Sequence, residues 1–272
     1  MSKQLFTEVK RLGYLPIHQI YKIRNSRRST SPGSEDEFEQ ILQKHADGES
    51  KVFVHAGLSD IRAAFDADPY VYLRDSLDRY FESILTPGFT DYFKTSGVYH
   101  LKYSRPKHGT FGKLFLKDSD YRTRDAIKSI LVKGPYRFEE CNHHDSYSPE
   151  GCFAKLVKDN VLVMNVGTQW ITCSHLHYFE SKYNVDYVID RTYEGVIYTD
   201  DTEYRQIEQS CSVYTSKYYS WNKPKLQRLL EERDVLHRYD LNGLNVWFFK
   251  LGDIEEVLGE KLQRDPFYLV TM

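Results

Sequence analysis

The segment of residues 160–166, which reads NVLVMNV, constrains the fold of this chain more than any other. It is largely apolar but does not alternate strictly, which is typical of a strand that is covered on both faces of its sheet. Gly167 ends the run, and a helix is expected to begin near Cys173–Ser174. A central, doubly covered strand that leads into a helix favours an α/β sheet.

Further strands and helices alternate around this segment. The expected strands are 51–55, 98–103, 186–198 and 211–219, and the expected helices are 37–45, 58–65, 70–85, 224–233 and 252–262. Residues 235–239 and 244–250 read as a hairpin, because Asn242-Gly243 between them is a strong turn signal. The order predicts an α/β fold in which a mixed central sheet is flanked by helices and has an antiparallel C-terminal portion.

The first fifty residues read as an extension to this domain. Residues 2–12 are typical of a short amphipathic helix, and residues 26–36 form a polar loop that contains the turn signal Pro32-Gly33. We therefore expect an N-terminal helical extension over residues 1–50 and one domain over residues 51–272.

Charge and cysteine content exclude several classes of protein. The 272 residues include 37 basic and 39 acidic side chains, so a dedicated DNA-binding role is disfavoured and no nucleic-acid partner is expected. No run of residues approaches 18 apolar positions, so no membrane partner is expected. The chain opens without an apolar signal segment, and its four cysteines form no C-x-x-C pair. A cytoplasmic protein with free thiols is the expectation.

The side chains best suited to chemistry lie in residues 174–180, which read SHLHYFE, soon after the central strand. Ligands of α/β sheets bind beyond the carboxyl ends of the strands. If the segment is helical, His177 and Glu180 are three residues apart and share a face. The carboxylate can then raise the basicity of the imidazole and orient it, as a general base requires. A structural ion pair gives the same pattern, and both interpretations stay open at this point.

Metal and thiol chemistry are alternatives. His175 and His177 are two residues apart and converge only in a strand, while residues 141–145 (CNHHD) carry zinc-type side chains that a polar loop also explains. Cys173 could be a nucleophile at a helix N-terminus or a small buried hydrophobe.

Basic residues are frequent between positions 102 and 133, where they form either a solvated face or a phosphate-binding surface. They are Lys102, Arg105, Lys107, Lys113, Lys117, Arg122, Arg124, Lys128 and Lys133. The sequence contains no G-x-S-x-G, P-loop or G-x-G-x-x-G motif, which disfavours elbow-type hydrolases, P-loop enzymes and Rossmann dehydrogenases.

These segments, taken in order, resemble the aminoglycoside 3-N-acetyltransferase family over roughly residues 50–270. Residues 52–59 (VFVHAGLS) are similar to the family's V-H-S-S-L-S, and residues 122–129 to its F-R-x…A-x-R-S. Four further matches follow: Ser148-Pro149 with Lys155-Leu156 to S-P-x-x-x-L, 161–167 to the glycine-ended strand, Cys173 with His177-x-x-Glu180 to N-T-x-x-H-x-x-E, and 251–266 to the closing helix and D-P.

The resemblance implies a fold unlike that of the GNAT acetyltransferases, an acyl-CoA donor, and an amine acceptor on a sugar or aminocyclitol. His177 would be the general base, and Glu180 would orient it or hold the acceptor amine. Backbone N–H groups near Gly57 or in a loop would stabilise the oxyanion. The residues implied for coenzyme A are His55, Ala56, Gly57, Leu58, Ser59, Lys128 and Ser129, and no metal is expected.

The expected function is therefore transfer of an acyl group from acetyl-CoA, or another acyl-CoA, to an amino sugar by direct attack. We expect the acceptor to be linked to a nucleotide and destined for a surface polysaccharide. Two observations favour it over an antibiotic: the family's H-P is replaced by Leu131-Val132, and the 37 basic residues suit a polycation poorly.

Three alternatives remain from the sequence. They are an aminoglycoside 3-N-acetyltransferase that acts on antibiotics, a metal-dependent hydrolase, and a carbohydrate-binding module that uses the 22 tyrosines to stack on sugars. The acyl chain length and the oligomeric state, including a homodimer, stay open.

Overall fold

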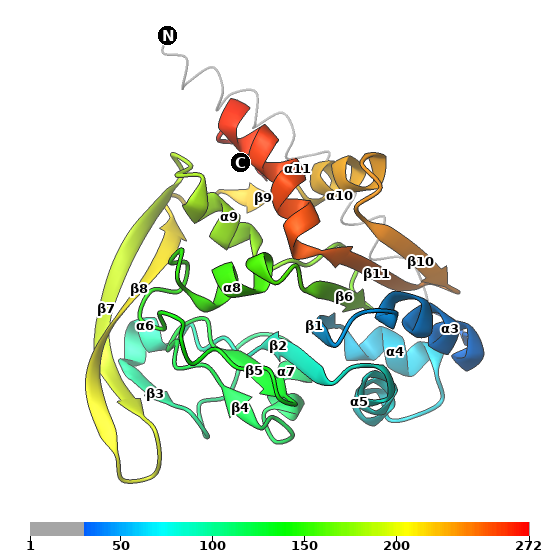
Figure 1. Ribbon diagram of the computed structural model, residues 1–272, viewed down its shortest axis with the longest axis horizontal. Helices are drawn as coiled ribbons and strands as arrows, with labels where there is room; N and C mark the ends of the chain where they lie inside the picture. The colour runs from blue at the N-terminus through cyan, green and yellow to red at the C-terminus, as the bar shows by residue number, and fades with distance from the viewer. Residues whose placement is uncertain (1–29, 272) are drawn as a thin grey trace.

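The computed structural model describes residues 30–271 and shows a mixed sheet between two layers of helices (Figure 1). The seven strands of this sheet lie in the order β10 (His237–Leu241), β11 (Leu244–Lys250), β6 (Leu162–Val166), β1 (Lys51–Ala56), β2 (Ser83–Pro87), β5 (Ile130–Lys133) and β4 (Tyr121–Arg122). Strands β6, β1 and β2 are parallel, and antiparallel strands complete both edges. The predicted α/β fold is confirmed. The helix expected over 2–12, and residues 26–29 of the expected loop, lie outside the described residues.

Alternate side chains of β1 enter two separate cores, because successive residues of a strand point to opposite faces. Val52 and Val54 belong to one core and Phe53 to the other. The first core is covered by α3 (Glu35–Ala46), α4 (Leu58–Ala64), α5 (Pro69–Tyr80) and α7 (Thr110–Phe115). The second core is covered by α6 (Phe93–Ser96), α8 (Cys152–Lys158), α9 (Leu176–Lys182), α10 (Lys223–Glu232) and α11 (Leu251–Arg264).

Two smaller sheets complete the described fold. One contains β3 (Val98–His100), β7 (Val188–Tyr198) and β8 (Tyr204–Tyr214), of which β7 and β8 form the long hairpin on the left of Figure 1. The other pairs β9 (Ser220–Trp221) with β12 (Val270–Thr271). These sheets matter for function because β8 and β9 carry side chains to the site described below.

The two strongest sequence signals are confirmed. Every residue of β6 is buried, and Val163 pairs with Phe53 of β1 on one side and Phe249 of β11 on the other. In the C-terminal hairpin, Asn242 and Gly243 have φ values of 52° and 95°. Positive φ at both central residues is what the favoured two-residue hairpin turn requires.

The helix expected over 70–85 is wrong beyond residue 80. Helix α5 ends at Tyr80, Phe81 already has an extended φ of −123°, and residues 83–87 form β2 between β1 and β5. A short apolar run that is buried on both faces does not reveal by periodicity whether it is a helix or a strand, and tertiary pairing decides.

The strand expected over 211–219 is misplaced. The observed strand β8 covers Tyr204–Tyr214. Its first half has no apolar pattern that would predict a strand, because it is largely exposed while it pairs with β7. Strands β4 and β5 are also absent from the sequence-based expectation, because they are only two and four residues long. The strand expected over 98–103 ends at His100.

The turns that follow β1 and β6 touch through two glycines. A Cβ atom at Gly57 would lie 2.1 Å from the carbonyl oxygen of Gly167, and one at Gly167 would lie 2.3 Å from that of Gly57. Gly167 also has a φ of +64°, which favours glycine. Gly57 is therefore required for the close approach of the two strand ends.

Replacing Gly57 by alanine is expected to lower the free energy of unfolding by about 1–3 kcal/mol, because the added methyl group forces the two turns apart. Urea denaturation followed by circular dichroism measures the change. Gly33→Ala is the control, since its Cβ would make only ordinary contacts at 3.7 Å. Equal stability of the two variants would show that the contact between the turns is not tight.

Candidate active site

A cavity of about 340 Å³ lies at the carboxyl ends of β1 and β2, where an α/β sheet is expected to bind ligands. Residues from β1, β2, the β6–α9 connection and the start of α7 form its walls. They are Val54, His55, Ala56, Thr86, Pro87, Phe89, His108, Gly109, Phe111, Gly112, Lys128, Thr168, Thr172, Ser174, His177 and Trp221.

Four of the residues singled out in the sequence line this cavity, although they come from distant segments. His55 and Ala56 end β1, Lys128 precedes β5, and His177 lies in the first turn of α9. Glu180 lies one helical turn after His177 and is hydrogen-bonded to it. The structure therefore brings the expected base and part of the expected coenzyme segment to one place.

The remaining predicted residues are not among those that line the cavity. Leu58 and Ser59 begin α4, where the Ser59 hydroxyl donates to Asp60 at 3.3 Å. Ser129 is fully buried and donates from Oγ to the Gly88 carbonyl at 2.7 Å. Gly57 packs against the β6 turn, and its N–H donates to the Val166 carbonyl at 2.9 Å. The N–H group of Gly57 itself is therefore used within the fold.

His177 and Glu180 form a directed pair. The Nδ1 atom of His177 lies 2.9 Å from Oε2 of Glu180, whose side chain is 0% exposed, while that of His177 is 30% exposed. A carboxylate accepts hydrogen bonds, so the pair holds the proton on Nδ1 and leaves the lone pair on Nε2. This is the tautomer that a general base needs.

Glu180 is held in turn by three donors that converge on its other oxygen, Oε1. The Tyr187 hydroxyl donates at 3.0 Å, the Tyr214 hydroxyl at 3.1 Å and the Trp221 indole N–H at 2.8 Å. A buried charge is tolerated when hydrogen bonds replace its water, and three donors on one oxygen suit an ionised carboxylate. Glu180 is therefore a fixed acceptor for His177.

The three donors escape recognition in the sequence, because they lie 7, 34 and 41 residues from Glu180. Tyr187 directly precedes β7, Tyr214 ends β8 and Trp221 lies in β9, and only folding brings them together. The abundance of tyrosine is the one signal that points to them. Trp221 and Tyr214 also pack on the ring of His177, with centroids 4.5 and 5.4 Å away.

Two other histidines near the cavity are held neutral. Burial lowers the pKa of His55 to about 3, with a further contribution from Lys223. Burial, followed by the proximity of His55, holds the pKa of His175 well below its ordinary value. His175 is fully buried between the rings of Phe53 and Phe153, with centroids 5.3 and 4.9 Å away. It therefore cannot share a ligand with His177, which faces the cavity.

The metal and thiol alternatives find no support in the structure. Within residues 30–271, no three or more His, Cys, Asp and Glu side chains are grouped so that they could hold a metal ion. Cys173 is buried, and burial raises the pKa of its thiol to about 12, which disfavours the nucleophilic thiolate. All four cysteines are free thiols, as predicted.

The basic stretch over 102–133 does not act as one surface. Arg122 is buried and donates to the backbone carbonyls of Leu101, Ser104 and Gly88, so it is structural. Lys128 lines the cavity.

Within residues 30–271, no helix is long and apolar enough to span a membrane.

Comparisons with known proteins bear on the family and the fold of this chain. Residues 88–263 match the family model of aminoglycoside 3-N-acetyltransferase. No curated protein matches the sequence. Three solved structures share the fold at sequence identities too low to show more than that. They are the apoenzyme of aminoglycoside acetyltransferase AAC(3)-IVa (TM-score 0.63, 15% identity, 89% of this chain and 92% of that chain), YokD from Bacillus subtilis (0.67, 12%, 89% and 97%), and AAC-IIIb in a binary complex with CoASH (0.66, 12%, 83% and 96%).

The family match covers more than half of the chain and includes β5, β6, the His177–Glu180 pair and most of α11. The fold matches are to aminoglycoside acetyltransferases, as expected for an architecture that is not of the GNAT type. The chain therefore belongs to the aminoglycoside 3-N-acetyltransferase family and is an N-acetyltransferase.

Proposed function

We propose that this protein transfers an acetyl group from acetyl-CoA to the amine of an amino sugar, with His177 as general base. The observation that carries the proposal is the His177–Glu180 pair, which presents an imidazole of defined tautomer to the cavity. Family membership supports the donor, and one related structure contains CoASH.

The chemistry of the transfer matches the residues present. A sugar amine is mostly protonated at neutral pH and must lose a proton before it can attack. Nε2 of His177 accepts that proton while Glu180 stabilises the imidazolium that forms. The amine nitrogen then bonds to the thioester carbon, the C–S bond breaks, and the thiolate of coenzyme A leaves and is protonated. No acyl-enzyme is needed. His55 and Ala56, at the end of β1, are proposed to flank the pantetheine arm.

The finer identity of the acceptor is also a proposal. We favour an amino sugar that is linked to a nucleotide and used for a surface polysaccharide. Support comes from Leu131 and Val132, which replace the family's H-P and are buried in β5. The alternative acceptor, an aminoglycoside antibiotic, is favoured by the family name.

A panel of amines separates these acceptors. Purified protein is incubated with acetyl-CoA and either UDP-linked amino sugars, simple amino sugars or gentamicin, and release of CoA is followed with a thiol reagent. We expect CoA release with the amino sugars, and more with the UDP-linked ones than with gentamicin. Equal or faster turnover of gentamicin would make the antibiotic the acceptor, and no release with any amine would contradict the function itself.

Binding of the donor is tested without turnover. Acetyl-CoA is expected to raise the melting temperature, because a ligand that binds only the folded state stabilises it. At a concentration about 100 times its Kd, the gain is about 2.7 kcal/mol. Longer acyl-CoAs measured in parallel report the acyl chain that the site accepts, and free adenosine is the control.

A further inference from the structure

Among the described residues, the cavity lined by His177 carries basic but no acidic side chains, which is unexpected in a family named after polycationic antibiotics. None of the residues that line it in the described part of the chain is an aspartate or glutamate, whereas Lys128 and His108 are among them. Glu180 lies behind His177 and is fully engaged by four hydrogen bonds. A polycation would meet no countercharge on these walls and would be repelled by Lys128.

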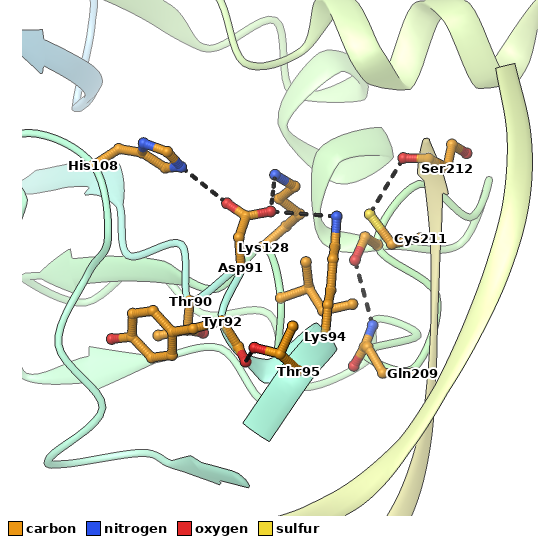
Figure 2. A network of polar contacts seen from close by, with 12 residues as sticks. Thr90, Asp91, Tyr92, Lys94, Thr95, His108, Lys128, Gln209, Cys211 and Ser212 are labelled. Atoms are coloured by element: carbon orange, nitrogen blue, oxygen red, sulfur yellow. Dashed lines mark hydrogen bonds and ion pairs between the residues drawn. The ribbon is translucent and has the colours of Figure 1, made fainter. Parts of the chain in front are cut away.

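Next to the cavity, one carboxylate pairs with several basic side chains that outnumber it. Asp91 Oδ1 lies 2.9 Å from the Lys128 ammonium and 3.4 Å from that of Lys94, and Oδ2 lies 3.1 Å from Nε2 of His108. Figure 2 shows Asp91 between these three side chains. Burial opposes ionisation of Asp91, but Lys128, Lys94 and His108 outweigh it and lower its pKa to about 2. One negative charge therefore faces two ammonium groups, and the cluster keeps a net positive charge.

Lys128 is the ammonium group of this cluster that lines the cavity, whereas Lys94 is not among the lining residues. Its side chain is 11% exposed and lies over the ring of Phe89, at 4.8 Å from the centroid, so it is ordered and largely desolvated. An ammonium group carries three N–H donors, and Asp91 occupies one of them. The remaining donors can bind an anion in a partly dry environment, where charge-assisted hydrogen bonds are strong.

The size of the cavity decides which anion this is. Lys128 shares a cavity of about 340 Å³ with His177, where the reacting amine and the thioester carbon must meet. The pyrophosphate of coenzyme A is separated from the thioester by the whole pantetheine arm with its two amide units. With the thioester beside His177, those phosphates lie outside this small space, whereas an anion on the acceptor itself lies inside it.

We propose that Lys128 is the specificity-determining residue for the acceptor and binds a carboxylate or phosphate carried by the same molecule as the reacting amine. The proposal rests on the proposed function and names the charge of its substrate. It replaces the role toward coenzyme A that the family resemblance implies for Lys128.

The test uses acceptors that differ in the anion. Glucosamine is compared with glucosamine 6-phosphate, 2-amino-2-deoxyglucuronic acid and a UDP-linked amino sugar, which separate a sugar phosphate, a carboxylate and a nucleotide pyrophosphate. In the wild type, kcat/KM for at least one anionic acceptor is expected to exceed that for glucosamine. Lys128→Met is expected to reduce that ratio roughly 10- to 100-fold, the value of one hydrogen bond to a charged group.

Lys94→Met is the matched control. It removes an ammonium from the same carboxylate, but Lys94 is not among the residues that line the cavity. The ratio is expected to change less than about twofold, because the charge of Lys94 acts on the acceptor only from a distance and is partly screened by solvent and salt. Lys128→Arg is expected to retain most of the preference, since it keeps the charge. Melting curves check that each variant is folded.

Direct binding, measured by calorimetry with glucosamine 6-phosphate and with glucosamine, separates this inference from the function on which it rests. Loss of the phosphate preference in Lys128→Met supports the inference, whether or not any amine releases CoA. The absence of CoA release with every amine would refute only the proposed function. An unchanged preference overturns it. It is also overturned if Lys128→Met raises KM for acetyl-CoA equally with every acceptor, because the cation would then serve coenzyme A.

Discussion

His177→Ala is expected to lower kcat/KM by about 10²- to 10⁴-fold, the usual contribution of a positioned general base. The loss has a defined cause, because neither of the other two imidazoles that line the cavity in the described part of the chain is placed to replace it. His108 is paired through Nε2 with Asp91 at 3.1 Å, and burial lowers the pKa of His55 to about 3, so His55 is too weak a base to take a proton from an alkylammonium ion. Steady-state kinetics with acetyl-CoA and the best acceptor of the panel measure the effect.

Two observations establish that this loss is chemical. The melting-temperature shift caused by acetyl-CoA should persist in His177→Ala, since the proposed mechanism has the imidazole contact the reacting amine and not the bulk of the donor. His237→Ala is the matched control, because that histidine is exposed on β10 and is not among the cavity-lining residues. Activity within a few-fold of wild type in His177→Ala would mean that another group accepts the proton.

Glu180→Gln is expected to lower kcat by about 10⁴-fold while the protein stays folded, by analogy with the orienting carboxylate of serine proteases. The amide oxygen can still accept from Tyr187, Tyr214 and Trp221, so the buried donors keep a partner. The amide NH₂ then faces Nδ1 of His177 and must donate to it, because the observed distance of 2.9 Å demands a hydrogen bond. The ring proton moves to Nε2, and the base is lost.

The kinetic signature distinguishes this tautomer effect from general damage. His177→Ala combined with Glu180→Gln should be no slower than His177→Ala alone, because the two residues act as one unit. Glu255→Gln provides the control, since Glu255 of α11 pairs with Lys182 of the same helix α9 and does not contact His177. Additive losses in the double variant would show that Glu180 acts independently of the base.

A structural role for Glu180 is expected as well, and it requires a different variant. Glu180→Leu removes the acceptor of three donors, of which Tyr187 is buried and Tyr214 and Trp221 are half-buried, and a buried donor left without a partner costs about 1–3 kcal/mol. We expect this variant to be strongly destabilised, whereas Glu180→Gln should be close to wild type. The contrast separates the packing role of the side chain from its charge.

Short sequence patterns alone predict one buried strand, one hairpin and one pair of side chains in this protein. The apolar run of β6 predicts its burial, because a strand with Asn165 as its single polar residue must be covered on both faces. Asn242-Gly243 predicts the hairpin, since few other pairs adopt positive φ twice. His177 and Glu180 predict each other, because helical geometry alone brings residues three apart together.

Long-range packing determines the rest. The donors that hold Glu180 come from the residue before β7, from the end of β8 and from β9, and Asp91 meets Lys128 across 37 residues of chain. No local periodicity encodes such contacts, since their free energy depends on elements that meet only in the folded state. The same holds for β2, whose short apolar run becomes a strand only because β1 and β5 flank it. Residue patterns thus predict the base and its fold, whereas the charge of the cavity and the anchoring of the base arise from tertiary contacts.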